Sequence, residues 1–123
     1  MLDLIGTLIN DTEDKLKWAI KGFERNAYAD SIYSSYATCV SGAKALLTGE
    51  GINCNTQIGI INDFEEKLVK SGKFFLASGS FSTQLLRMSD QEPTKEFAAQ
   101  FLEEAKEFVA KIKEYRLQQV VVK

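Results

Sequence analysis

The sequence predicts an all-α protein, a bundle of four or five helices in up-and-down order with short connections. The chain of 123 residues contains one proline, so few positions interrupt a helix. Apolar residues recur at helical spacing over most of the chain, and clusters that contain glycine separate the periodic segments. We therefore expect a single domain, residues 1–123, with one hydrophobic core.

The first two helices are predicted on either side of a connection near residue 25. Around the polar residues 10–12, Asp11 is a candidate N-cap, which leaves the start of the first helix open. The apolar residues that keep helical spacing in this segment are Ile5, Ile9, Leu16, Ile20 and Phe23. The second helix is expected from about Ala27 to Thr48, because Gly49 and Gly51 form a helix stop.

The third and fourth helices are predicted from shorter apolar patterns. N-cap candidates at residues 53–56 precede the third helix, which we expect to end near Gly72. Apolar residues from Phe74 and Phe75 to Met88 predict a fourth helix. The start of this helix is left open because residues 78–80 weaken its first half.

The fifth helix has the longest apolar stripe. Pro93 suits its first turn, because proline has no backbone N–H to donate there. The stripe consists of Phe97, Phe101, Ala105, Phe108, Ile112 and Tyr115. The tail from Gln118 to Val122 is rich in β-branched residues, and its structure is left open.

Composition argues against several classes of function. The chain has no histidine, which removes the commonest general base, the commonest zinc ligand and every Ser-His or Cys-His catalytic group. A net charge of −2 supplies no basic stripe for a nucleic-acid backbone. Two cysteines are too few for a structural zinc or iron–sulfur site. No apolar run reaches the roughly 20 residues of a membrane helix, so we expect a cytoplasmic protein without a metal or cofactor of its own.

The predicted helix at residues 28–47 divides into three rows when its residues are sorted by helical spacing. The apolar row, which we expect in the core, contains Tyr28, Ile32, Tyr36, Val40, Ala43 and Leu47. A row of small side chains predicts close helix packing rather than cysteine chemistry; it contains Ser31, Ser35, Cys39 and Gly42. A polar row forms either a solvated face or a ligand site; it contains Asp30, Ser34, Ser41 and Lys44.

Three sequence motifs, taken together and in their order along the chain, indicate a family resemblance. They are YATCVSGAKALL at residues 36–47, TQIGIINDF at residues 56–64 and A-x-x-F-x-x-x-I at residues 105–112. These motifs resemble the HEPN family (higher eukaryotes and prokaryotes nucleotide-binding), in which a Tyr-rich helix ending in Ala-Leu-Leu precedes a loop and a Ser/Thr-His-x-Gly helix. The resemblance covers most of the chain after about residue 12. It implies a helical bundle, a nucleotide or other small ligand, and a homodimer paired through its helices.

A narrower resemblance is found nearer the N-terminus. The segments LKWAIKGF at residues 16–23 and YADSIYSSY at residues 28–36 are similar to the HEPN-like C-terminal segment of some nitrite and sulfite reductases of the Bacteroidetes. The resemblance implies that this chain is the C-terminal domain of a longer reductase and that Met1 is not the start of the whole protein. Siroheme and an iron–sulfur cluster would then lie elsewhere in that parent protein.

The chain differs from the family at the positions of the family's conserved histidine and arginine residues. When it is aligned on residues 43–47, the helix histidine falls at Ser41 and an arginine that often precedes it falls near Ser34. The histidine that follows the loop falls at Gln57. Serine and glutamine still donate and accept hydrogen bonds, so the resemblance implies a polar cleft that binds without catalysis.

The ribonuclease members of the family use an arginine followed, after four to six residues, by a histidine. Two arginines of this chain, Arg25 and Arg87, are candidates for the first position. The comparable later positions carry Asp30 after Arg25 and Glu92 after Arg87, with no histidine. RNA cleavage of the family's type therefore lacks its histidine in this chain.

These observations lead to one main hypothesis and two alternatives. The main hypothesis is a non-catalytic accessory domain of a nitrite or sulfite reductase that binds a small ligand, such as a nucleotide, or mediates subunit contacts. The candidate ligand-binding residues are Asp30, Ser34, Ser41, Lys44 and Gln57. One alternative is an RNA-cleaving, toxin-like HEPN protein. The other is a module whose only role is to form oligomers.

Overall fold

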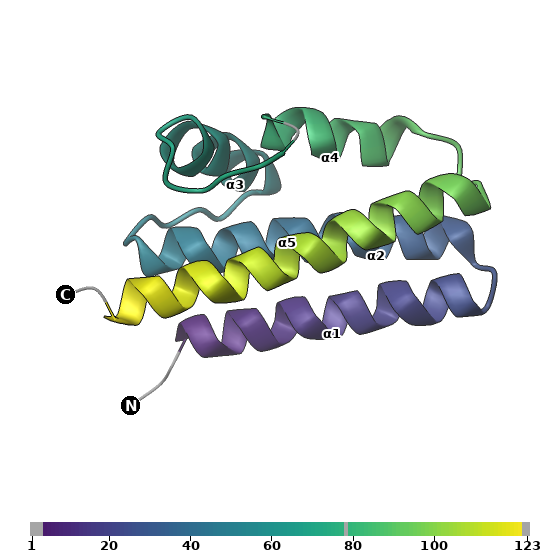
Figure 1. Ribbon diagram of the computed structural model, residues 1–123, viewed down its shortest axis with the longest axis horizontal. Helices are drawn as coiled ribbons and strands as arrows, with labels where there is room; N and C mark the ends of the chain where they lie inside the picture. The colour runs from purple at the N-terminus through teal and green to yellow at the C-terminus, as the bar shows by residue number, and fades with distance from the viewer. Residues whose placement is uncertain (1–3, 78, 122–123) are drawn as a thin grey trace.

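A computed structural model describes residues 4–77 and 79–121. It contains five α-helices within these residues, so the predicted all-α class is confirmed (Figure 1). Their bounds are α1 (Leu4–Glu24), α2 (Tyr28–Gly49), α3 (Gln57–Phe64), α4 (Phe81–Asp90) and α5 (Lys95–Val121). A π-helical segment, η1 (Glu65–Val69), continues α3. No described helix is long and apolar enough to cross a membrane.

The three long helices lie side by side, and the two short ones cover one side of them. In Figure 1, α1 runs antiparallel to α2, while α5 lies along α2 in the same direction. Helices α3 and α4 lie on the side of α2 and α5 that faces away from α1. Helix α2 therefore occupies the centre of the bundle, where it contacts all four other helices.

The row of small residues on α2 is buried throughout, as the sequence predicts. On the α1 side, the Ser31 hydroxyl donates to the Ala19 carbonyl oxygen over 2.8 Å. On the α5 side, a Cβ added to Gly42 would lie 3.1 Å from the Phe108 ring. Small side chains thus allow two neighbouring helices to approach α2 closely, and the packing interpretation of Cys39 is confirmed by its complete burial.

Helix α1 continues through the polar residues where the sequence left its start open. Thr12 is buried, and its hydroxyl lies 2.8 Å from both the Leu8 carbonyl oxygen and the Ser41 hydroxyl of α2. Asp11 is therefore a residue inside α1 and not an N-cap. The Thr12–Ser41 contact joins the two antiparallel helices.

Four phenylalanine rings form the centre of the core between α3, α4 and α5. The ring centroid of Phe108 lies 5.7 Å from that of Phe64, 5.5 Å from that of Phe74 and 5.4 Å from that of Phe81. Phe74 is buried although it lies outside any helix, whereas Phe75 is exposed. The fourth helix therefore begins at Phe81, after the Ser80 N-cap, and not near Phe74.

The fifth helix begins two residues later than the sequence predicts. The Thr94 hydroxyl accepts a hydrogen bond from the Phe97 backbone N–H over 3.1 Å, as an N-cap side chain does. Pro93 consequently precedes the helix and does not lie in its first turn. At the other end, α5 includes Gln118 and continues to Val121, and Val122 lies outside the described residues.

The start of α4 is held by a carboxylate from η1. Glu65 is only 7% exposed, and its Oε1 accepts hydrogen bonds from the Ser82 backbone N–H over 2.9 Å and the Ser80 hydroxyl over 3.0 Å. Burial alone would raise the pKa of this carboxyl, but the hydrogen bonds from residues 80–82 outweigh it and hold the pKa below its usual value. The negative charge also stabilises the helix N-terminus.

We predict that Glu65→Gln lowers the free energy of unfolding by about 1–2 kcal/mol near neutral pH, because the charged cap of α4 is lost. A carboxyl with a depressed folded-state pKa stabilises the protein above its unfolded pKa, and this stabilisation is lost as pH falls through the folded pKa. The difference between wild type and variant should therefore shrink between about pH 7 and about pH 3 in urea denaturation. The exposed Glu66→Gln is the matched control, and a pH-independent difference would contradict the role of the charge.

Close packing at Gly42 leads to a second prediction. Gly42→Val should lower the free energy of unfolding by about 1–3 kcal/mol, because its methyl groups meet the buried Phe108 ring. Ala37→Val adds methyl groups at a half-buried position of the same helix and should cost less than about 1 kcal/mol. Equal urea midpoints for the two variants would contradict this prediction, because α2 and α5 could then move apart without loss of stability.

Candidate functional site

A groove lies between the first half of α2, the start of α3 and the end of α4. We call it the tyrosine groove; its volume is about 480 Å³. The residues that determine its chemistry are Ile32, Tyr33, Tyr36, Gln57, Met88 and Gln91. Three segments that are distant in sequence thus build one surface depression.

The tyrosine groove combines an apolar floor with aromatic walls. Ile32 and Met88 are buried and form the floor. Tyr33 is 72% exposed, and Tyr36, one turn later on α2, is half-buried. Exposed aromatic rings above an apolar floor are suited to stacking against a flat group, such as a nucleobase.

Two amide side chains, Gln57 and Gln91, are among the polar groups that line this groove. Gln57 is the first residue of α3, where the Thr56 hydroxyl caps the helix by accepting from the Gly59 N–H over 3.0 Å. Gln91 follows α4 directly. Both amides donate and accept hydrogen bonds but do not titrate near neutral pH. The tyrosine groove can therefore recognise polar edges, and its lining carries no carboxylate, amine or histidine.

One of the positions that the HEPN resemblance marks, Gln57, lines the tyrosine groove. Gln57 occupies the place of the family's histidine after the loop. Glu92, at the place of the ribonuclease histidine after Arg87, lies between Gln91 and Pro93, which both line the groove. Glu92 itself is exposed. Of these two positions, Gln57 lines the groove, and Glu92 adjoins two lining residues in sequence.

The other four candidate binding residues lie along α2 outside the groove lining. Asp30 is exposed, while Ser34 and Lys44 are half-buried. Ser41 is engaged with Thr12 in the contact between α1 and α2. The structure thus places Gln57 in the groove and Ser41 in a helix contact, and a ligand site on these four residues stays a prediction.

Tyr33 is the residue that sequence reasoning missed. It belongs to none of the three rows defined on α2, because it lies between the apolar and the polar row. A large aromatic residue beside a polar helix face was the available signal, since exposed aromatics are enriched where proteins bind. Met88 was recognised as apolar, but its role as floor depends on how α4 packs.

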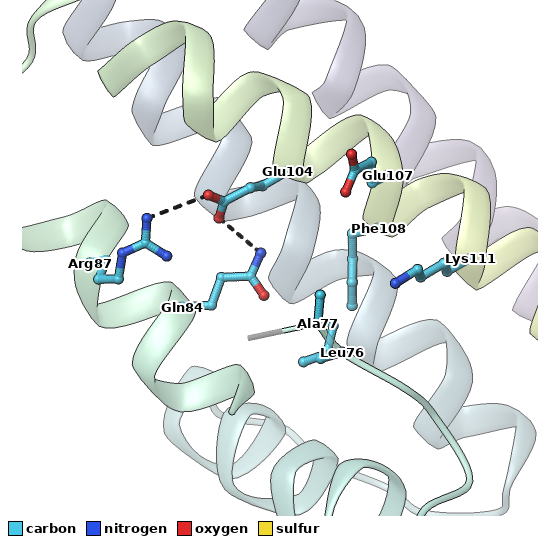
Figure 2. Close-up of a pocket in the computed structure, with 8 residues that line it drawn as sticks. All are labelled: Leu76, Ala77, Gln84, Arg87, Glu104, Glu107, Phe108 and Lys111. Atoms are coloured by element: carbon cyan, nitrogen blue, oxygen red, sulfur yellow. Dashed lines mark hydrogen bonds and ion pairs between the residues drawn. The ribbon is translucent and has the colours of Figure 1, made fainter. Parts of the chain in front are cut away.

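Arg87 points away from the tyrosine groove, toward α5. Its guanidinium donates to Glu104 Oε2 over 3.5 Å and lies 5.7 Å from the centroid of the Phe101 ring (Figure 2). Arg25, the other arginine considered, follows the end of α1 and is exposed. Neither arginine lines the groove.

Both cysteines are held as thiols. Burial raises the pKa of Cys39 far above its ordinary value. Cys54 donates to Asp63 Oδ2 over 3.0 Å, and burial, followed by the contact with Asp63, raises its pKa to about 11. Neither side chain is a thiolate nucleophile near neutral pH. Among the described residues, no group of three or more His, Cys, Asp or Glu side chains could hold a metal ion.

Comparison with known proteins gives one informative match. No family model matches the sequence. The chain is 30% identical over 115 residues to the protein named "Putative toxin MJ0605" of Methanocaldococcus jannaschii. The aligned region covers 89% of this chain and 86% of the archaeal protein. The chain therefore belongs to the same family as this archaeal protein.

Proposed function

We propose that this chain is a toxin-like HEPN protein that acts on RNA through the tyrosine groove. The observation that carries the proposal is the match along 89% of the chain to an archaeal protein whose name describes a toxin. The helical bundle is consistent with the HEPN resemblance. Among the alternatives raised by the sequence, the toxin-like protein is thus better supported than the reductase domain, and association with a reductase stays a prediction.

The chemistry of the groove supports a single-stranded target. Stacking of bases on Tyr33 and Tyr36 needs unpaired bases, and the amides of Gln57 and Gln91 can hydrogen-bond to base edges. The net charge of −2 provides little general attraction to phosphates. We therefore expect the affinity for single-stranded RNA to depend strongly on stacking against the tyrosine rings and only weakly on salt concentration.

Cleavage of RNA would need a base other than histidine. In cleavage by internal transfer, the ribose 2′-oxygen loses its proton, bonds to phosphorus and displaces the 5′-oxygen, which takes up a proton. Glu92 adjoins the groove through Gln91 and Pro93, and a carboxylate can accept the 2′ proton. Water would return the proton to the leaving oxygen, since no group lining the groove is a good proton donor near neutral pH.

A second candidate function, binding of a nucleotide without cleavage, is favoured by one observation. The chain has no histidine at all, so the acid–base pair of the ribonuclease members is missing. The groove would then retain recognition by stacking and by amide hydrogen bonds. This candidate corresponds to the ligand-binding part of the main hypothesis from the sequence.

Inducible expression in a bacterial host tests the toxin-like role. We expect growth to slow on induction and the effect to weaken when Tyr33→Ala and Gln57→Ala are combined, because both changes remove groove contacts. Trp18→Ala is the matched control, since Trp18 is 60% exposed on α1, outside the groove. Unchanged growth at confirmed expression would contradict the proposal, as would equal effects of the control and the groove variant.

Incubation of the purified protein with labelled single-stranded RNA separates cleavage from binding. If Glu92 is the base, cleavage products should appear without added metal and decrease by about 10²-fold or more in Glu92→Gln. Glu96→Gln, an exposed change in the first turn of α5, should leave the rate unchanged. If the RNA stays intact but raises the melting temperature of the protein, the second candidate function, binding without cleavage, is supported instead. The reason is that a ligand that binds the folded state stabilises it.

A further inference from the structure

The tyrosines of this chain divide into two pairs according to what their hydroxyl groups contact. The chain has four tyrosines. The hydroxyl groups of Tyr28 and Tyr115 each donate to another side chain, over 2.9 Å and 3.4 Å. Tyr33 and Tyr36 of the tyrosine groove make no hydrogen bond through their hydroxyl groups to any described residue. The two groove tyrosines therefore keep their hydroxyl groups available to a ligand.

The two amides of the tyrosine groove are not engaged within the protein either. Gln57 and Gln91 are exposed, and neither side chain has a hydrogen-bond partner among the described residues. Elsewhere in the described chain, Gln84, Gln100 and Gln119 each donate to a carboxylate. Water satisfies an exposed amide in the free protein, so a ligand can replace that water without breaking a contact inside the protein. Four polar groups that are open to a ligand thus line one depression.

The uncharged lining limits which nucleobases the tyrosine groove can prefer. Its side chains are aromatic, amide, hydroxyl or apolar, and none carries a charge near neutral pH. Guanine is most often recognised by arginine or lysine, which donate to its O6 and N7, and cytosine by a carboxylate that accepts from its amino group. The lining offers neither partner. The groove is therefore poorly matched to guanine and to cytosine.

Adenine matches the groups that the groove does offer. Its amino group lies next to a ring nitrogen that only accepts, and a glutamine amide accepts from the first while it donates to the second. The other ring nitrogens of adenine can accept from the free hydroxyl groups of Tyr33 and Tyr36. Uracil also pairs with an amide, but its single ring covers less area of an aromatic side chain than the double ring of a purine. Stacking and edge chemistry thus favour the same base.

We propose that the tyrosine groove selects adenine over the other bases of single-stranded RNA. The base stacks on Tyr33, which is 72% exposed, and the amides of Gln57 and Gln91 bind the edge that carries its amino group. Each of these three side chains is accessible at the surface. The inference rests on the proposed function for RNA as the source of the base, and it adds which base the groove prefers.

This inference and the proposed function fail separately. A protein that slows growth but binds the bases with equal affinity retains the toxin-like role and overturns the base assignment. A protein that prefers adenine but does not slow growth retains the base assignment alone.

RNA that cannot be cleaved tests the base preference apart from any turnover. Hexanucleotides of adenine, uracil or cytosine with 2′-O-methyl groups lack the 2′-hydroxyl group that internal transfer needs. We expect the adenine hexanucleotide to bind the full chain at least about fivefold more tightly than the other two, as measured by NMR titration of the ¹⁵N-labelled protein. The side-chain NH₂ signals of Gln57 and Gln91 should shift. Equal dissociation constants, or no saturable shift with the adenine hexanucleotide, would overturn the proposal.

Nucleosides separate the edge contacts from stacking. Purine riboside has the double ring of adenosine but no amino group, and guanosine has a carbonyl oxygen in the place of that group. Both should stack on Tyr33 as adenosine does, but they should bind about three- to tenfold more weakly, because a hydrogen bond to an amide is lost. Equal affinity for adenosine and purine riboside would show that the amides do not select the base and would overturn the proposal.

Variants of the exposed groove residues complete the test. Combining Gln57→Met with Gln91→Met removes both amides at similar volume and should bring the affinities for adenosine and purine riboside to within about twofold of each other. Gln118→Met is the matched control: it removes an exposed amide of α5 outside the groove and should keep the difference. Tyr33→Ala should weaken all the nucleosides alike, by about fivefold or more, since stacking does not depend on the base edge. A preference for adenosine that persists in the double variant would overturn the proposal.

Discussion

The ring of Phe108 is the contact on which the arrangement of the other helices depends. It lies against Gly42 of α2 and meets the rings of Phe64, Phe74 and Phe81. One side chain thus joins the central helix to both short helices and to the segment between them. Burial of such rings is the main source of stability in a core of this size, at about 2–3 kcal/mol for each large apolar side chain.

Helix α4 packs on the core and contributes residues to two different parts of the protein surface. Phe81 fixes its start in the core, and the Glu65 carboxylate satisfies the N–H groups that the helix leaves unpaired there. The later residues then divide between two sides. Met88 contributes to the tyrosine groove, while Gln84 lines a cleft beside α5.

Helical spacing was sufficient to predict which residues share one face of a helix. It was not sufficient to predict the contacts and surfaces that several segments form together. The small row with Cys39 and Gly42 could be recognised because its residues follow one another on α2. The burial of Phe74 outside any helix could not, because an apolar residue continues a helical pattern equally well when the chain has left the helix. The tyrosine groove needs Tyr33 and Met88, which only the packing of α4 on α2 brings together. The cap from Glu65 is likewise a contact between segments that no local pattern indicates.

The π-helical segment has a consequence for how this family can vary. The Lys70 backbone N–H donates to the Glu65 carbonyl oxygen, five residues earlier, where an α-helix would use a spacing of four. The segment therefore accommodates one residue more than a regular helix of the same length. Removal of one residue between 65 and 69 would restore a regular helix while rotating Glu65 relative to the residues that follow. Relatives that lack the extra residue should consequently lack the acidic cap as well, so insertion and cap are expected to be gained and lost together in evolution.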